Sequence, residues 1–168
     1  MGLVYRATAG TAAAAKERDD AEVLRKVLPD FDNNPQAEKK TVTVNDVQFP
    51  VYTARKGGQI VGYAVETLST KGYGGDIILM VGFTPQGEIV GIEVLSQNET
   101  PGLGDRIENG KSNFSTQFIG KNPATFRLRI KREGGQVDAI TASTISSRAY
   151  CQAVQRGYAA VMQQVRGQ

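Results

Sequence analysis

The sequence predicts an α+β fold, with helices packed on a curved antiparallel sheet. Apolar runs separated by turn residues fill residues 41–95, a pattern typical of antiparallel strands. Towards both ends of the chain, apolar residues recur every three or four positions, as they do in amphipathic helices. Strands that are grouped together, rather than alternating with helices, favour the α+β class over a parallel α/β fold.

The first predicted elements are a helix and a connector. Residues 12–28 show helical spacing, and Pro29 ends the run. The polar stretch 31–40 is typical of a connector. We therefore divide the chain of 168 residues into an N-terminal part, 1–40, and one domain, 41–168.

A meander of antiparallel strands is predicted next. Residues 41–54 alternate apolar and polar side chains, which indicates a pair of half-buried strands. Two similar segments, 58–66 and 87–95, each begin with a turn glycine and continue as a strand. Between them, residues 75–83 form a nearly continuous apolar strand. Together these segments predict one sheet of sequential strands.

Three elements are predicted after the sheet. Residues 112–120 indicate a short helix with Phe114 and Phe118 on one face. Residues 125–133 predict a strand whose apolar and basic side chains point in opposite directions, and the glycine pair after it predicts a turn. The last helix is predicted over residues 144–166, with an apolar stripe of Val154, Tyr158, Val161 and Val165.

The composition excludes several kinds of site. The chain has no His, which excludes a Ser-His-Asp triad, an imidazole zinc site and a His-ligated haem. Its single Cys, Cys151, excludes an internal disulfide, and we expect it to be a small core residue. The net charge of +3 does not indicate a nucleic-acid partner. Chemistry must therefore use carboxylates, hydroxyls, Lys or Arg, or a cofactor supplied from outside.

A run of hydroxyl side chains stands where the last predicted helix begins. These hydroxyls either cap the helix amides or help to form an anion site, since a helix N-terminus has free N–H groups and the positive end of its dipole. Arg148 follows Thr144 by four residues, on the same helix face, and would pair with a bound phosphate. The hydroxyl residues are Thr141, Ser143, Thr144, Ser146 and Ser147.

A glycine-rich loop, Glu99-Thr-Pro-Gly-Leu-Gly104, follows the last strand of the meander. A purely structural turn is one interpretation, because Pro followed by Gly is a turn signature. The other is a binding loop, since small residues on either side of Leu103 let a flat ring approach the backbone. The run Gly72-Tyr-Gly-Gly75 does not satisfy GxGxxG, so a Rossmann site is not predicted.

Residues 72–108, 114–121 and 137–150 carry a family resemblance, chiefly through ETPGLGD and DAITAST. The chain resembles the FMN-binding domain of the G subunit of the Rnf electron-transport complex. It is similar, more distantly, to the C subunit of the sodium-pumping NADH:quinone reductase. The resemblance implies the RnfG/NqrC type of fold and FMN as a covalently bound cofactor.

In that family, FMN is joined through its phosphate to the last Thr of a D-x-x-S/T-G-A-T motif, and a flavin transferase installs it from FAD. The resemblance therefore implies Thr144 as the attachment residue, with Ala142 and Ser143 where the family usually has Gly and Ala. It also implies that the ETPGLG loop lies against the flavin; Lys131 is a further expected contact, from the basic strand. The expected cofactor-binding residues are Thr144, Asp138, Thr141, Ser143, Ser147, Arg148, Glu99, Thr100, Leu103, Gly104 and Lys131.

The function implied by the resemblance is electron transfer. The chain would be a redox subunit, with no turnover of its own, of an ion-translocating ferredoxin:NAD oxidoreductase complex. It would act on the periplasmic face of the bacterial inner membrane, beside the other subunits. The N-terminal membrane helix of that family is expected to precede residue 1 and to be removed from the present sequence. Two alternatives remain: a sensory FMN-binding domain of a membrane regulator, and a flavin-free extracytoplasmic binding domain in which the hydroxyls only cap.

Overall fold

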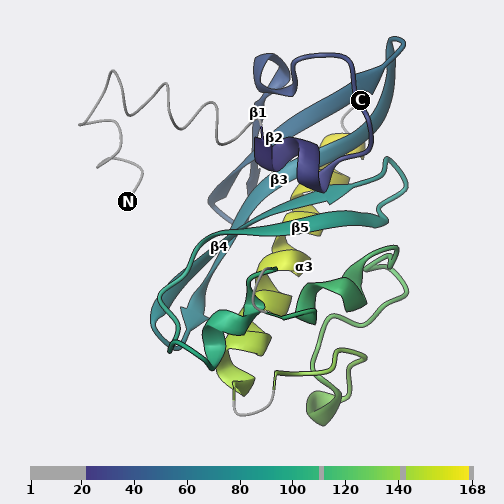
Figure 1. Ribbon diagram of the computed structural model, residues 1–168. Coiled ribbons are helices and arrows are strands. Elements are labelled where there is room, and N and C mark those ends of the chain that lie inside the picture. Colours follow the sequence, from purple (N-terminus) through teal and green to yellow (C-terminus); the bar gives the residue numbers. More distant parts are fainter. Residues whose placement is uncertain (1–21, 110–111, 141–142, 167–168) are drawn as a thin grey trace, which may run out of the picture.

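A computed structural model describes residues 22–109, 112–140 and 143–166, and its centre is an open five-stranded antiparallel sheet. The strands lie side by side in chain order, so the predicted meander and the α+β class are confirmed (Figure 1). The long last helix, α3, runs across the sheet at Thr144–Arg166, the range that the sequence predicted. The strands are β1 Lys40–Val44, β2 Val47–Lys56, β3 Gln59–Gly72, β4 Gly75–Phe83 and β5 Ile89–Ser96.

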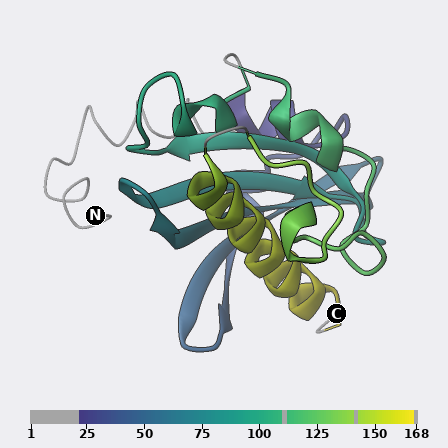
Figure 2. The same ribbon diagram turned by 90° about the horizontal axis from the view of Figure 1, so that it is seen from below.

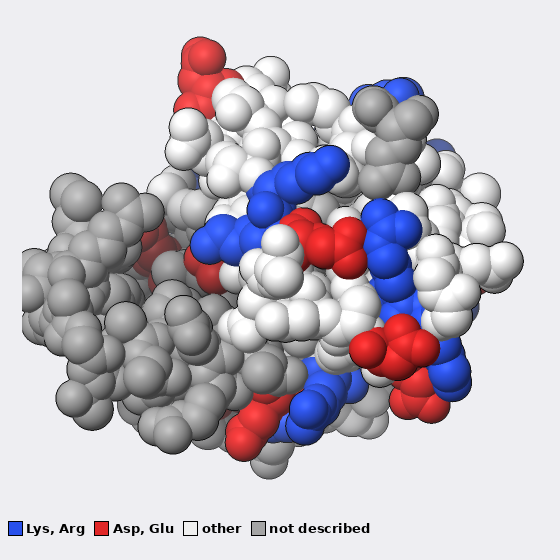
Figure 3. All heavy atoms as spheres, turned by 90° about the horizontal axis from the view of Figure 1, so that it is seen from above, with Lys and Arg blue, Asp and Glu red and all other residues white. Residues whose placement is uncertain are grey.

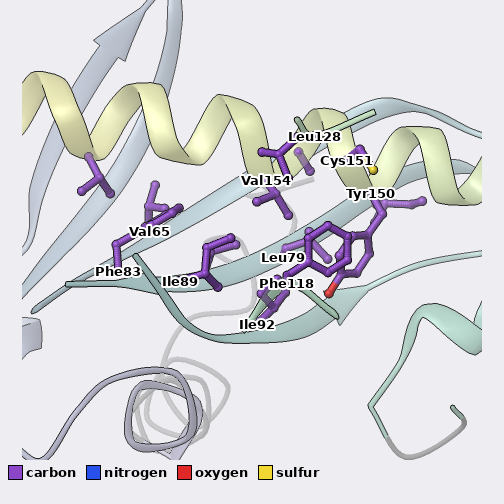
Figure 4. Packing of buried hydrophobic residues seen from close by; sticks show 14 of the residues in the cluster. Val65, Leu79, Phe83, Ile89, Ile92, Phe118, Leu128, Tyr150, Cys151 and Val154 are labelled. Atoms are coloured by element: carbon purple, nitrogen blue, oxygen red, sulfur yellow. The ribbon is translucent and has the colours of Figure 1, made fainter. Parts of the chain in front are cut away.

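One face of the sheet packs against α3 (Figure 2). In Figure 4 side chains from β3, β4 and β5 meet those of the helix, and Val65, Leu79 and Val154 belong to this shared core. The helix lies close to β3, as a hydrogen bond between them shows: Thr67 Oγ1 donates to the Ala153 carbonyl oxygen at 2.7 Å. The predicted apolar stripe is confirmed as part of this core.

Cys151 lies in the same core, as expected, and is 2% exposed (Figure 4). Burial raises the pKa of its thiol to about 12. A thiol with so high a pKa has almost no reactive thiolate near neutral pH, so Cys151 acts through packing.

The opposite face of the sheet is covered by the N-terminal segment, where residues 22–27 are helical and Leu24, Val27 and Leu28 are buried. This confirms the last part of the predicted helix, and its first part lies outside the described residues. The connector contains one turn of 3-10 helix, Pro35–Glu38. Helices in the described ranges are too short or too polar to cross a membrane.

Glycines on three adjacent strands let this N-terminal segment approach the sheet backbone. Gly62, Gly82 and Gly91 face it, and a Cβ placed on Gly82 would lie 1.7 Å from the carbonyl oxygen of Val27. That distance is far below van der Waals contact, so the segment can lie here only if this position has no side chain.

Gly82→Ala is therefore expected to lower the free energy of unfolding by about 1–3 kcal/mol, the usual cost of overpacking a tight contact. Ser96→Ala, at an exposed position of β5, should leave stability nearly unchanged. Urea unfolding of both variants measures the difference. Equal midpoints for Gly82→Ala and the unsubstituted chain would contradict the close approach of the N-terminal segment.

The prediction of a strand over residues 125–133 is wrong. The segment contains one 3-10 turn, Lys131–Glu133, and a single bridge between Ile130 and Val137. Its backbone instead bonds locally, for example from Val137 N to the Arg129 oxygen at 3.0 Å. At the start of β5, Gly120 N donates to the Ile89 oxygen at 2.7 Å, so residues 120–121 rather than this segment bond to that end of the strand.

The alternation that suggested this strand is nevertheless real. Leu128 and Ile130 are buried, whereas Arg127, Arg129 and Lys131 are exposed. The glycine turn after the segment is confirmed, since Gly134 has a positive φ of 86°. The predicted short helix is also present, as a 3-10 helix at Phe114–Phe118, and both of its Phe side chains are buried.

Charged side chains are scattered over the face that Figure 3 shows. Outside the grey region, Lys and Arg lie next to Asp and Glu, and much of the surface between them is uncharged. This face therefore presents charges of mixed sign rather than a patch of one sign.

Candidate functional site

A pocket of about 570 Å³ lies where three segments meet. These are the turn between β3 and β4, the loop of residues 99–104, and the first turn of α3. The volume is within the range of about 300–1,000 Å³ typical of small-molecule sites. The lining residues are Tyr73, Thr100, Leu103, Gly104, Ser143, Thr144, Ile145 and Ser146.

Exposed apolar side chains are concentrated at this pocket. Among the described residues, four large hydrophobic side chains are exposed, and three of them line it: Tyr73 at 67%, Leu103 at 40% and Ile145 at 46%. Each comes from a different one of the three segments. Apolar side chains gathered on a surface indicate a binding site, here with walls suited to a flat apolar ring.

The hydroxyls at the start of α3 differ in what they contact. Ser147 is fully buried; its Oγ donates to the Ser143 carbonyl oxygen and accepts from the Ile140 amide, each at 2.9 Å. Ser146 Oγ donates to Glu99. Thr144 is half-buried and lines the pocket, whereas Thr141 lies outside the described residues. Thr144 is thus the partly exposed hydroxyl residue in the pocket wall formed by the described part of α3.

Ser143 occupies the N-cap position, since its carbonyl oxygen accepts the first helical hydrogen bond, from Ser147 N at 3.0 Å. Ser143 lines the pocket, but its own hydroxyl is buried and has no hydrogen-bond partner among the described residues. A buried hydroxyl without a partner costs about 1–3 kcal/mol. This unpaired group at the positive end of a long helix suits a phosphate oxygen as its missing acceptor.

The glycine-rich loop packs closely on α3. Thr100, Leu103 and Gly104 line the pocket, so three residues of the expected binding loop lie at one cavity. A Cβ on Gly104 would lie 2.3 Å from Ser146 Oγ, so only glycine allows this approach. The loop is a tight turn, in which Gly102 has a φ of 79° and its amide donates to Asp105 at 2.8 Å.

Glu99 lies behind the pocket wall rather than in it. It is 4% exposed, and its carboxylate accepts hydrogen bonds from the amides of Tyr73 and Gly74 at 2.9 and 2.8 Å. The residue therefore joins parts of the site together and does not line the cavity.

Three expected cofactor residues have other partners. Arg148 donates to Glu133 through Nε at 2.8 Å, and this contact lowers the pKa of the Glu133 carboxyl. Lys131 and Asp138 form an exposed ion pair of 2.8 Å with each other. Asp138 lines a smaller pocket of about 320 Å³ beside Gln117, and none of these three side chains lines the larger pocket.

Sequence reasoning missed Tyr73 and Ile145 as wall residues. Tyr73 stands in the glycine-rich turn 72–75, which does not fit a dinucleotide-binding pattern. The sequence feature that could have identified Tyr73 is an aromatic residue between glycines in a hairpin turn. Such a side chain has no neighbouring core residues to pack against. Ile145 is likewise an apolar residue within a run of hydroxyls.

Comparison with known proteins agrees with this geometry. A family model described as "FMN-binding domain" matches residues 72–159, a range that contains every residue lining the pocket. The G subunit of the ion-translocating oxidoreductase complex of Shewanella piezotolerans is 36% identical over 166 residues, covering 91% of this chain and 78% of that protein. The protein of the same name from Haemophilus influenzae (strain PittEE) is 39% identical over 144 residues, covering 81% and 68%.

The resemblance drawn from the ETPGLGD and hydroxyl motifs is thus confirmed, and the architecture agrees with an α+β FMN-binding domain. The match extends over most of the chain and of these relatives. This chain belongs to the family of G subunits of ion-translocating oxidoreductase complexes and carries an FMN-binding domain.

Proposed function

We propose that the pocket at the start of α3 holds FMN, joined through its phosphate to Thr144, and that the chain transfers electrons within an ion-translocating ferredoxin:NAD oxidoreductase complex. One observation carries the proposal: the pocket brings exposed apolar walls together with the N-terminus of a 23-residue helix and the half-buried Thr144. FMN, when bound, supplies reversible electron uptake and release.

The pocket offers suitable surfaces for both the phosphate and the ring of FMN. At the α3 end, the helix dipole and the unpaired Ser143 hydroxyl favour a phosphate. On the walls formed by the β3–β4 turn and the loop, Tyr73 and Leu103 offer apolar surface to a flavin ring. Since Arg148 is already paired with Glu133, we assign the phosphate to the helix end and not to Arg148.

Burial distinguishes the two neighbouring hydroxyls as attachment points. Ser143 Oγ is buried, whereas the Thr144 residue is partly exposed in the pocket. In the proposed transfer, Thr144 Oγ1 bonds to the flavin-side phosphorus of FAD, the pyrophosphate bond breaks, AMP leaves, and the hydroxyl proton goes to a base. A flavin transferase supplies that base, because the described residues place no His or unpaired acid in the pocket wall.

The names of the relatives support a place in a multi-subunit, ion-translocating complex. We propose that the other subunits of such a complex are the redox partners of this chain. The family resemblance further supports a position at the periplasmic face of the bacterial inner membrane, held there by a membrane helix preceding residue 1. The chain needs no catalytic base of its own, since its role after flavin attachment is to hold and position the cofactor.

Production with and without a flavin transferase tests this proposal. Chain made with the transferase should be yellow and should fluoresce in a denaturing gel, and chain made without it should do neither. In membranes that hold the whole complex, removal of this chain should stop NAD reduction by ferredoxin. A chain that stays colourless with an active transferase would favour the flavin-free binding domain instead.

A further inference from the structure

The carboxylate of Glu99 collects donors from parts of the chain that are far apart in sequence. Tyr73 N donates to Oε1 at 2.9 Å, and Gly74 N donates to Oε2 at 2.8 Å, across 26 and 25 residues respectively. Ser146 Oγ donates to Oε1 across 47 residues. With 4% of the residue exposed, these bonds replace the water that a carboxylate needs.

These donors belong to two walls of the pocket, and Glu99 itself begins the third. Tyr73 and Gly74 form the turn between β3 and β4, whereas Ser146 is in the first turn of α3. Glu99 opens the loop that continues to Gly104. One buried side chain therefore connects all three segments that surround the cavity.

The backbone around Glu99 leaves little room for these walls to move closer together. A Cβ on Gly74 would lie 1.8 Å from the Asn98 carbonyl oxygen, and one on Gly104 would lie 2.7 Å from Glu99 Cβ. Such contacts fix the distance between segments only while the hydrogen bonds hold them together. The carboxylate of Glu99 supplies those bonds.

We propose that Glu99 is the positioning residue of the site, which holds the Tyr73 turn against the start of α3 so that the Tyr73 ring lies against the bound flavin. This inference rests on the proposed function. Because 67% of Tyr73 is exposed, the packed core does not fix the position of its ring. Its backbone amide, bonded to Glu99, determines where the side chain stands over the pocket.

Amide hydrogen exchange in flavin-free protein tests whether Glu99 holds the Tyr73 turn against α3, an arrangement called the clamp below. Glu99→Gln replaces one accepting oxygen by an NH₂ group, which cannot accept from a backbone amide. Exchange at whichever of Tyr73 and Gly74 faces the new NH₂ group, followed by NMR, should accelerate on the order of tenfold, whereas amides in the middle of β4 should keep their protection. Glu88→Gln, at an exposed acid, is the matched control and should change neither amide.

Unchanged exchange at Tyr73 and Gly74 in Glu99→Gln would overturn the proposal. Equal acceleration at every amide would also overturn it, because that result means a general loss of stability without a local clamp. This experiment needs no cofactor, so it decides on the clamp even if the proposed function fails.

Flavin fluorescence tests the effect on the loaded protein. A Tyr ring against a flavin quenches its emission, so Tyr73→Leu should raise the fluorescence yield several-fold. Glu99→Gln should raise it in the same direction, and the double variant should show no further rise, since both changes act on one contact. A yield that Tyr73→Leu raises and Glu99→Gln leaves unaltered would contradict the positioning role.

Discussion

Thr144→Val should abolish covalent flavin completely. Valine has nearly the shape of threonine but no hydroxyl, so the oxygen that would bond to phosphorus is missing while the first turn of α3 is kept. The residue is only half-buried and no packing of the core depends on it, so stability should change little. The check is in-gel flavin fluorescence and the intact mass of chain made with a flavin transferase.

Ser143→Ala is the matched control for this result. It removes the neighbouring hydroxyl, which is buried and has no partner in the described part of the chain. Covalent flavin should still be present at the end of the reaction, and stability of the flavin-free chain should stay equal or rise slightly. An adduct that survives Thr144→Val and disappears with Ser143→Ala would move the attachment to Ser143.

Gly104→Val should have the second largest effect. A Cβ at this position would lie 2.3 Å from Ser146 Oγ and 2.7 Å from Glu99 Cβ, and a branched side chain adds further overlap. The loop would have to separate from α3, which removes Leu103 from the pocket wall. We expect a loss of about 1–3 kcal/mol in stability and a fall in flavin loading on the order of tenfold.

Gly102→Asn tests whether this effect is specific to the close contact. Gly102 has a φ of 79° and no atom near its Cβ position, and Asn tolerates a positive φ better than most residues. The variant should therefore load flavin and unfold nearly as the unsubstituted chain does. Normal loading and an unchanged melting temperature for Gly104→Val would contradict the proposed packing of loop on helix.

Much of the fold was predictable because its sequence signals are local. Glycines and the Asn45-Asp46 pair mark the turns of the meander, and both residues of that pair have positive φ, at 50° and 66°. The spacing of apolar residues determined the long last helix within its observed limits. The prediction of a strand over residues 125–133 was wrong for a different reason. Alternation of apolar and polar residues indicates which side chains are buried, but a strand also needs a neighbouring strand with which its backbone can pair.

The candidate site was predictable only in part. The motifs located Thr144 and the loop to Gly104, since hydroxyls at a helix start and glycines in a turn are visible in sequence. They could not show that Glu99 turns away from the cavity, because its donors lie at distant positions in the chain. The pairing of Arg148 with Glu133 depends in the same way on tertiary structure.

The central claim is a bond between Thr144 and the phosphate of FMN, and peptide mapping by mass spectrometry tests it most directly. The chain would be isolated from membranes that contain the complete complex and a flavin transferase, then digested and sequenced. We expect the peptide spanning residues 138–148 to carry one FMN adduct, located at Thr144. Recovery of that peptide unmodified, or an adduct on a different residue, would contradict the account.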